Sequence, residues 1–403
     1  MHNPFITRIT IRNYKSIAAC RIDLHDLTFL VGPNGSGKSN FLDAFRFTSD
    51  SLKTSLDHAL RERGTIKEVR RRSGGHPNRF AIRLDFVLSP SQSGHYSFRI
   101  GEKPAGGFEV LAEECFVHDE AVLGDPHFYS VNAGKVHASS FNSPPASLSD
   151  RLYLVAVSGF SEFRPVFDAL SRMEIYNLNP REISAMQRPD PGELLRRDGS
   201  NAASVLQKLP ETSQKLVSSF LSRIAKGVSG AESKTLGSQE TIEFRQAVKG
   251  QKHPWHFLAS SMSDGTLRAF GILLSVFQAT TGANTAPLLI GLEEPEMALH
   301  PAAAGVLLSA LREGARHCQI LVTSHSADLL DDPDIPTESL LAVDVQDGVT
   351  RIGPIDQAGR QVLHDRLFTP GELLRQNQLT PDETALSDVD DDRQLQLFGE
   401  SRR

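Results

Sequence analysis

The stretch GPNGSGKS at residues 32–39 constrains the fold of this chain more than any other feature of its sequence. It follows the pattern G-x-x-x-x-G-K-[ST], comes directly after the apolar run LTFLV, and precedes FLDAFRF, whose apolar residues recur at helical spacing. Glycines let backbone N–H groups turn toward a phosphate without a Cβ clash, and the start of a helix favours negative charge. The pattern predicts a phosphate-binding loop between a strand and a helix, and hence an α/β fold.

The residue types in this loop indicate how a nucleotide would be held. The Lys38 ammonium is suited to bridging the β- and γ-phosphates of ATP, and the Ser39 hydroxyl to binding Mg²⁺. ATP and Mg²⁺ are therefore the predicted cofactors. The loop residues expected at the nucleotide are Asn34, Gly35, Ser36, Gly37, Lys38, Ser39 and Asn40.

A second apolar run, in LLIGLEEP, ends in the acidic pair Glu293 and Glu294. Open α/β sheets bind ligands at the carboxyl ends of their strands, and side chains alternate in direction along a strand. Adjacent acids can therefore do two jobs, with Glu293 in the Mg²⁺ shell and Glu294 as the base that orients or deprotonates water. Alone, such a pair is more often a solvated strand end. Together with the phosphate loop it predicts an ATPase.

The rest of the chain has a recognisable order of elements. Alternating residues from 78 to 131 predict an antiparallel β lobe, and residues 200–225 read as mostly helical. Helices alternating with apolar strands in the last third are typical of a parallel α/β core. Between these blocks we expect a strand at LYLVAV, a helix near FRPVFDALSR and a strand at MEIYNL. The helical stretch is too short for a long coiled coil.

The order of motifs resembles the nucleotide-binding domain of ABC-type ATPases, in their RecF/SMC-like branch. The motifs are the phosphate loop, the turn SDGT at 263–266 before a helix, the acidic strand end, and the strand end TSH at 323–325. The phrasing LEEPE and LHP further resembles compact bacterial AAA/ABC ATPases of phage-defence and DNA-maintenance operons. The resemblance covers most of residues 1–378.

This resemblance implies roles for further residues. Ser263 and Gly265 would cap the γ-phosphate of ATP held by another subunit, so the active form would be an ATP-dependent homodimer. His325 falls on a switch histidine, making Lys38, Glu294 and His325 the catalytic set, and Lys15 falls near the nucleotide. Taken alone, SDGT is more simply a helix N-cap. The turn also departs from the transporter signature LSGGQ, His300 replaces an aspartate, and no Q-loop glutamine can be assigned.

The resemblance also implies a bilobed head. One lobe is expected at about 1–150 plus 285–355, a helical signature lobe at about 151–284, and a helical end at 356–378. Residues 379–403 are acidic and predict a flexible tail. The tail contains QLQLF, with Gln394, Leu395, Leu397 and Phe398, which is similar to peptides that dock on bacterial sliding clamps. Alternatively, this segment packs back on the protein's own surface.

Function beyond ATP hydrolysis stays open between several classes. The first is a switch that controls a DNA-directed or effector activity, in phage defence, with a nuclease or toxic subunit as partner. The second is a RecF-like loader in DNA repair or replication. A transporter subunit is disfavoured by the signature and by the β-rich insert.

Composition and local clusters narrow these alternatives. A net charge of −6 gives no overall basic excess, so any DNA contact must be local, as at Arg70, Arg71 and Arg72, which could equally be a solvated face. No apolar run approaches the roughly 20 residues of a membrane span, and we expect a cytoplasmic protein without membrane contacts. His253 and His256 have metal-like spacing but lack an accompanying carboxylate cluster in sequence.

Overall fold

The computed structural model describes residues 4–73, 77–120, 125–281, 286–390 and 397–398. The chain divides into two compact units, each built from segments that are distant in sequence. The first unit comprises 1–173, 336–361 and 379–403, and the second comprises 174–335 and 362–378. The phosphate loop thus belongs to the first unit, whereas the acidic pair and the SDGT turn belong to the second.

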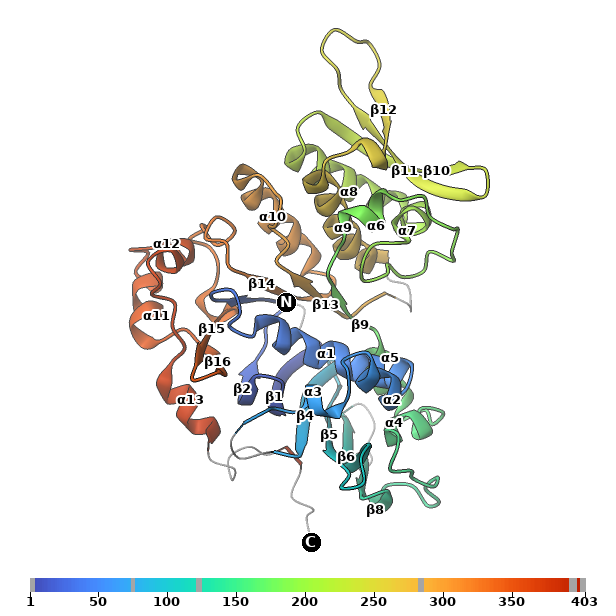
Figure 1. The fold of residues 1–403 in the computed structure, drawn as a ribbon, viewed down its shortest axis with the longest axis vertical. Helices are drawn as coiled ribbons and strands as arrows, with labels where there is room; N and C mark the ends of the chain where they lie inside the picture. The colour runs from blue at the N-terminus through green and yellow to red at the C-terminus, as the bar shows by residue number, and fades with distance from the viewer. Residues whose placement is uncertain (1–3, 74–76, 121–124, 282–285, 391–396, 399–403) are drawn as a thin grey trace. The chain divides into compact units, whose positions relative to one another are not determined.

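The strands of the first unit form a mixed sheet in the order β8-β7-β6-β5-β4-β1-β2-β16-β15-β3 (Figure 1). Most neighbours are antiparallel, but β15 runs parallel to β3 and β16 parallel to β2. The predicted antiparallel β lobe is confirmed by β4 to β8. The strands are β1 (Ile6–Tyr14), β2 (Ile17–Asp23), β3 (Leu27–Val31), β4 (Arg79–Ser89), β5 (Gln92–Glu102), β6 (Phe108–Asp119), β7 (His127–Asn132), β8 (Lys135–Ser139), β15 (Leu340–Gln346) and β16 (Val349–Pro354).

Helices of the first unit begin with α1 (Lys38–Lys53), which follows the phosphate loop as predicted. The strand predicted at LYLVAV is wrong, because Tyr153–Val157 form the short helix α4. The buried Glu113 carboxylate accepts the N–H groups of Tyr153 and Leu154, so a tertiary contact caps this helix and overrides the apolar, strand-like pattern. The other helices are α2 (Leu56–Arg61), α3 (Ile66–Val69), α5 (Arg164–Ser171), the 3₁₀ turn η4 (Thr337–Ser339) and α13 (Glu383–Asp390).

Helix α13 lies within the tail that we expected to be flexible. Asp382, just before it, accepts a hydrogen bond from Arg360 at 2.8 Å, and Glu383 pairs with Arg351 at 2.7 Å. These ion pairs connect the start of the acidic segment to β16 and α11. Helix α11 (Gln357–His364) supplies Arg360.

The second unit contains the parallel pair β13 (Leu289–Glu293) and β14 (Gln319–Ser324), with β9 (Met173–Tyr176) next to β13. This arrangement confirms the expected parallel α/β pattern of the last third. Its helical elements are α6 (Pro180–Ser184), α7 (Ala202–Lys208), α8 (Glu211–Ile224), η1 (Ala259–Ser261), α9 (Asp264–Phe277), η2 (Gln278–Thr281), η3 (Pro301–Ala303), α10 (Ala304–Gly314) and α12 (Pro370–Arg375).

A separate three-stranded antiparallel sheet also belongs to the second unit, in a region expected to be helical. It consists of β10 (Val228–Leu236), β11 (Gln239–Gln246) and β12 (Trp255–Leu258) (Figure 1). Ile242 and Phe244 are buried, and the Phe244 ring packs edge-on against Phe270 of α9, with centroids 5.4 Å apart. One apolar face therefore fixes the sheet to the helices, and its other face carries charged side chains.

Two expected absences concern long helices. The longest of the described helices is α1, with 16 residues, which is far shorter than the coiled-coil arm of an SMC protein. The part of the chain that the structure describes therefore has no long coiled coil, as predicted. Within the same residues, no helix has the length and apolar character needed to span a membrane.

Candidate functional site

The phosphate loop links the end of β3 to the first turn of α1. Gly35 and Gly37 have positive φ angles of 78° and 101°, the left-handed region that favours glycine. Helix α1 starts at Lys38 with no side-chain cap at its N-terminus, and a helix N-terminus favours a bound anion. Ser39 is exposed at this helix start. The loop is thus built to receive a phosphate group.

Two glycines are also required by close packing. A Cβ at Gly32 would lie 1.9 Å from the carbonyl oxygen of Val343, and one at Gly37 would lie 2.0 Å from Thr350 Oγ1. Strands β15 and β16, about 300 residues later in the sequence, therefore pack directly against the loop. Neither contact could be foreseen from the loop's own sequence.

A relay of hydrogen bonds from β16 fixes the loop backbone. Asn40 Nδ2 donates to Ser16 Oγ at 2.7 Å, and Ser16 Oγ lies 2.7 Å from Thr350 Oγ1. The Thr350 hydroxyl donates to the Ser36 carbonyl at 2.9 Å. The predicted loop residue Asn40 thus supports the loop from behind through this relay.

Lys38 lies along the loop it is expected to serve. Its Nζ donates to the carbonyl oxygens of Gly32 at 2.8 Å and Pro33 at 2.9 Å, and the residue is only 5% exposed. These contacts hold the ammonium over the loop. Ser36 is buried, whereas Asn34 and Gly35 are exposed at the loop's tip.

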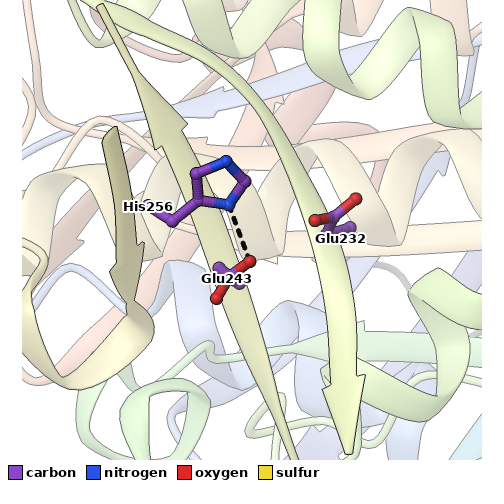
Figure 2. A group of neighbouring side chains, drawn as sticks. All are labelled: Glu232, Glu243 and His256. Atoms are coloured by element: carbon purple, nitrogen blue, oxygen red, sulfur yellow. Dashed lines mark hydrogen bonds and ion pairs between the residues drawn. The ribbon is translucent and has the colours of Figure 1, made fainter. Parts of the chain in front are cut away.

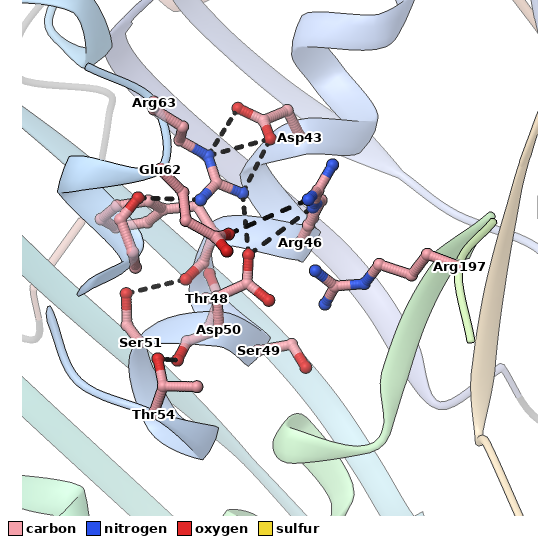
Figure 3. Close-up of polar contacts among 12 residues, drawn as sticks. Asp43, Arg46, Thr48, Ser49, Asp50, Ser51, Thr54, Glu62, Arg63 and Arg197 are labelled. Carbon is pink, nitrogen blue, oxygen red and sulfur yellow. Dashed lines mark hydrogen bonds and ion pairs between the residues drawn. The ribbon is translucent and has the colours of Figure 1, made fainter. Parts of the chain in front are cut away.

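Lys15 is engaged by an acidic group on α1. Its Nζ lies 2.6 Å from Asp43 Oδ2, and Asp43 also accepts a hydrogen bond from Tyr14 at 2.8 Å. Arg63 donates to the same carboxylate at 3.0 Å (Figure 3). Burial alone would raise the pKa of Asp43, but Arg63 and Lys15 lower this pKa to about 2. Arg63 also contacts Asp50 at 3.1 Å, about two helical turns further along α1. The network braces α1, and a nucleotide contact by Lys15 stays a prediction.

The acidic pair lies at the end of β13, in register with β14. Glu293 is paired with Thr323 across the parallel strands, and the Glu294 N–H donates to the Thr323 carbonyl at 3.0 Å and to Thr323 Oγ1 at 3.2 Å. Glu294 has a φ of 44°, which a residue with a Cβ adopts only under constraint. The backbone therefore turns sharply at Glu294, directly after β13 ends.

The predicted switch histidine contacts the predicted base. His325 Nδ1 lies 3.2 Å from Glu294 Oε1, and the two side chains are 38% and 27% exposed. They are therefore partly accessible to solvent and to a ligand. Residues 294 and 325 lie far apart in sequence, and the structure brings them together at adjacent strand ends.

The SDGT turn begins helix α9. Ser263 is its N-cap and accepts from the Thr266 N–H at 3.3 Å, so the simpler N-cap reading is correct for the free chain. Ser263 is also exposed, which leaves the helix start open to a ligand. A Cβ at Gly265 would lie 2.4 Å from the carbonyl oxygen of Ala298, so this glycine lets α9 approach the loop after β13.

Arg268, on α9, is a site residue that sequence reasoning missed. Its Nη2 donates to the carbonyl oxygens of Glu293 at 3.1 Å and Glu294 at 3.2 Å, and its Nη1 donates to Leu178 at 3.0 Å. Burial lowers the pKa of Arg268, and nearby carboxylates oppose that shift. The signature helix is thereby fastened to the backbone of the acidic pair within the second unit. An arginine one turn after SDGT was the only sequence signal for it.

Glu296 is the other residue that was missed. Its Oε1 accepts from Ser324 Oγ at 2.6 Å and from the His325 N–H at 3.3 Å. Burial raises the pKa of Glu296, and the hydrogen bond from Ser324 opposes this rise. The only hint of Glu296 in the sequence was that it is the third acidic residue of EEPE.

A group of three potential metal ligands lies on the charged face of the three-stranded sheet. Ligand atoms of Glu232, Glu243 and His256 all lie within 4.8 Å of one another, and His256 Nδ1 is 2.7 Å from Glu243 (Figure 2). His256 therefore does have carboxylate neighbours, contrary to the expectation from sequence. Lys234 also contacts Glu243, so a cation would have to displace this ammonium. We interpret the group as an ion-pair network.

The basic cluster proposed for DNA is partly neutralised. Arg70 pairs with Glu102 at 2.9 Å, and Arg72 pairs with Glu68. Lys67 also lies 3.6 Å from Glu102. Arg71 is half-buried. These acidic partners weaken the case for a phosphate-binding surface, and DNA contact stays a prediction.

The tail peptide contacts the first unit at its two last described residues. Leu397 is 5% exposed, and the Arg99 guanidinium lies over the Phe398 ring, 4.8 Å from its centroid. Gln394 and Leu395 lie outside the described residues. The two described anchors favour the alternative in which this segment packs back on its own chain.

A glycine loop between strand and helix, and paired acids at the end of a parallel strand, are typical of ATPases of the phosphate-loop class. Residues 131–332, half of the chain, match the family described as "AAA domain, putative AbiEii toxin, Type IV TA system". Residues 5–99 match a family described as "AAA ATPase domain". The chain belongs to the first of these AAA-domain families.

Comparisons with individual proteins point to the heads of SMC proteins. The chain is 25% identical over 181 residues to structural maintenance of chromosomes protein 1 of Schizosaccharomyces pombe, spanning 40% of this chain but only 14% of that protein. An SMC head bound to the C-winged helix domain of ScpA has a TM-score of 0.57, with 13% identity, covering 88% of this chain and 99% of that chain. The Smc head of Pyrococcus yayanosii has a TM-score of 0.50, with 12% identity, covering 90% and 100%. The predicted ABC/SMC-like head fold is confirmed.

Proposed function

We propose that this chain is an ATP-hydrolysing switch protein that dimerises face to face around ATP·Mg²⁺ and opens after hydrolysis. The observation that carries the proposal is the contact of His325 with Glu294, at 3.2 Å, on a backbone turned to positive φ. Glu294 is the base, Glu293 and Ser39 hold Mg²⁺, and Lys38 binds the phosphates. His325 senses the γ-phosphate.

The dimer rests on the SDGT turn. Ser263 and Gly265 stand at the start of α9, a helix of 14 residues, where a hydroxyl, a close backbone and the positive helix end suit a γ-phosphate. Ser263 is exposed, in keeping with a role toward a second copy. If each site needs residues of two chains, the specific activity rises with protein concentration.

The output of the switch is control of a toxic or DNA-directed activity. The family description names a toxin of a type IV toxin–antitoxin system, which supports an effector role in defence over a transporter role. A RecF-like loader is the second candidate, and its support is the tail motif QLQLF together with the likeness to SMC heads. The packing of Leu397 and Phe398 on the first unit counts against clamp binding.

The test is the mass of the Glu294→Gln protein in solution, measured by light scattering with and without ATP·Mg²⁺. We expect ATP to convert monomer to dimer, because the variant binds ATP but does not hydrolyse it. Ser263→Arg, which places a bulky cation at the helix start, should abolish the dimer and the turnover while ATP still binds. Full hydrolysis by Ser263→Arg would contradict the composite site. Adding duplex and gapped DNA to the trapped dimer then separates the DNA-directed alternatives.

A further inference from the structure

The loop after β13 contains a half-buried glutamate, Glu296, whose Oε2 is fully buried and which ATP hydrolysis, as proposed above, does not use. The Glu296 side chain contacts the end of β14, where its Oε1 accepts hydrogen bonds from the Ser324 hydroxyl at 2.6 Å and the His325 N–H at 3.3 Å. Residues 324 and 325 are the strand end that carries the switch histidine. Glu296 therefore contacts the backbone of His325, while His325 contacts Glu294 with its ring.

We propose that Glu296 is a positioning residue: it holds the Ser324–His325 strand end so that the His325 imidazole faces the Glu294 carboxylate. The inference rests on the proposed function, since it concerns the geometry of the same site. Glu296 acts through His325 and makes no contact with the nucleotide.

The cost of placing a carboxyl group here argues for a specific role. Its Oε2 is buried, and no residue in the described ranges gives this atom a hydrogen-bond partner. Burying a carboxyl oxygen without a partner is unfavourable, and a buried turn can be fixed more cheaply by serine or threonine. Such a local cost is typical of residues retained for the geometry of a site.

The fully buried Glu113 shows what a purely structural acid looks like in this chain. Glu113 of β6 is 1% exposed, and its carboxylate accepts from Tyr96 at 3.0 Å, Tyr129 at 2.9 Å and the Leu154 N–H at 2.8 Å. It also accepts from the Tyr153 N–H, so both of its oxygens are satisfied. Glu296 has only its Oε1 satisfied, and both donors belong to the strand end of the switch histidine.

The arrangement also links two backbone segments, the loop after β13 and the end of β14, by several hydrogen bonds. Glu294 is tied to Thr323 by its N–H, and Glu296 is tied to Ser324 and His325 by its side chain. The Met297 N–H donates to the Glu294 carbonyl at 3.1 Å and closes the turn between them. Glu294 keeps its own hydrogen bond to Thr323 when Glu296 is replaced. Loss of the Glu296 side chain therefore releases the His325 backbone but leaves the Glu294 carboxylate in place.

The experiment compares Glu296→Ala, Glu296→Gln and Ser324→Ala in the full chain, with Glu211→Ala on the exposed face of α8 as the matched control. Glu296→Ala should lower kcat about tenfold, with ATP affinity changed less than about twofold, because losing hydrogen bonds to one carboxyl group misplaces His325. Glu296→Gln keeps the Oε1 acceptor and should retain kcat within about threefold of the unaltered protein.

A double variant tests whether Glu296 works through the strand end. Glu296→Ala combined with Ser324→Ala should lose no more turnover than Glu296→Ala alone, since both changes break the same contact. Equal losses in the Ala and Gln variants, an unchanged kcat in Glu296→Ala, or additive losses in the double variant would each overturn the inference and leave the ATPase intact. If the unaltered protein has no ATP turnover, the proposed function fails instead.

Discussion

The phosphate loop and the loop after β13 serve one proposed reaction but are built in different ways. In the first, residues 32–39 supply the glycines, the lysine and the helix start from one continuous stretch. In the second, the loop at 293–299 depends on Arg268 from α9 and on Thr323, Ser324 and His325 from β14. A local loop can be recognised from its own sequence. A loop held by tertiary contacts keeps its geometry only while those contacts last, so its failures should affect turnover more than binding.

The largest expected effect is at the phosphate loop. Lys38→Ala removes the ammonium that lies over Gly32 and Pro33, and ATP affinity should fall about 100-fold or more, since charge-assisted hydrogen bonds to phosphate are lost. Titration with a fluorescent ATP analogue measures this directly. Lys53→Ala, exposed at the other end of α1, is the control. Normal ATP binding by Lys38→Ala would mean that this loop is not the nucleotide site.

The acidic pair should give the opposite result, with turnover lost and binding kept. Glu294→Gln removes the base but preserves the shape of the side chain, so kcat should fall about 10²–10³-fold while ATP affinity changes less than about threefold. Single-turnover hydrolysis and equilibrium binding, measured on the same protein, separate the two quantities. If ATP affinity falls as much as kcat, the loop after β13 affects binding as well as turnover, and the proposed difference between the two loops is wrong.

Arg268 should give an intermediate result. Arg268→Ala leaves the carbonyls of Glu293 and Glu294 without their shared donor, and kcat should fall about tenfold, because a hydrogen bond from a charged group contributes about 1.5–3 kcal/mol. Lys215→Ala, on the surface of α8, controls for loss of a positive charge. The readouts are ATP turnover and the thermal midpoint. A lower midpoint with unchanged turnover would make Arg268 structural only.

These contrasts also explain what the sequence could predict. The strand, glycine loop and helix at residues 27–53 were predictable because one short motif specifies all three, and alternation specified the antiparallel β4 to β7. The placing of Glu294 and His325 in one catalytic set followed only from resemblance. Their mutual contact, and the contacts of Arg268 and Glu296, were not predicted. The error at Tyr153–Val157 and the unexpected helix at Glu383–Asp390 have the same origin. Glu113 caps one segment, and Arg351 and Arg360 hold the other, from positions distant in sequence.

The smallest expected effect is at Thr350, the β16 residue whose hydroxyl holds the phosphate loop through the hydrogen bonds described above. Thr350 is 2% exposed, and its hydroxyl donates to the Ser36 carbonyl at 2.9 Å. Thr350→Val keeps the branched shape and removes this donor, so about 1 kcal/mol of support is lost and ATP affinity should weaken about fivefold. Equilibrium binding of ATP measures the change, with Thr54→Val, exposed after α1, as the control.

Turnover at saturating ATP should stay within about twofold of the unaltered value in Thr350→Val, since the acidic pair is untouched. Only ATP affinity is then reduced, as expected for a loop whose conformation is set mostly by its own residues. A larger loss of kcat than of affinity would mean that the phosphate loop depends on its distant strand as strongly as the loop after β13 depends on α9 and β14. The two sites would then share one mode of construction, and the glycine motif would specify the phosphate loop less completely than its sequence suggests.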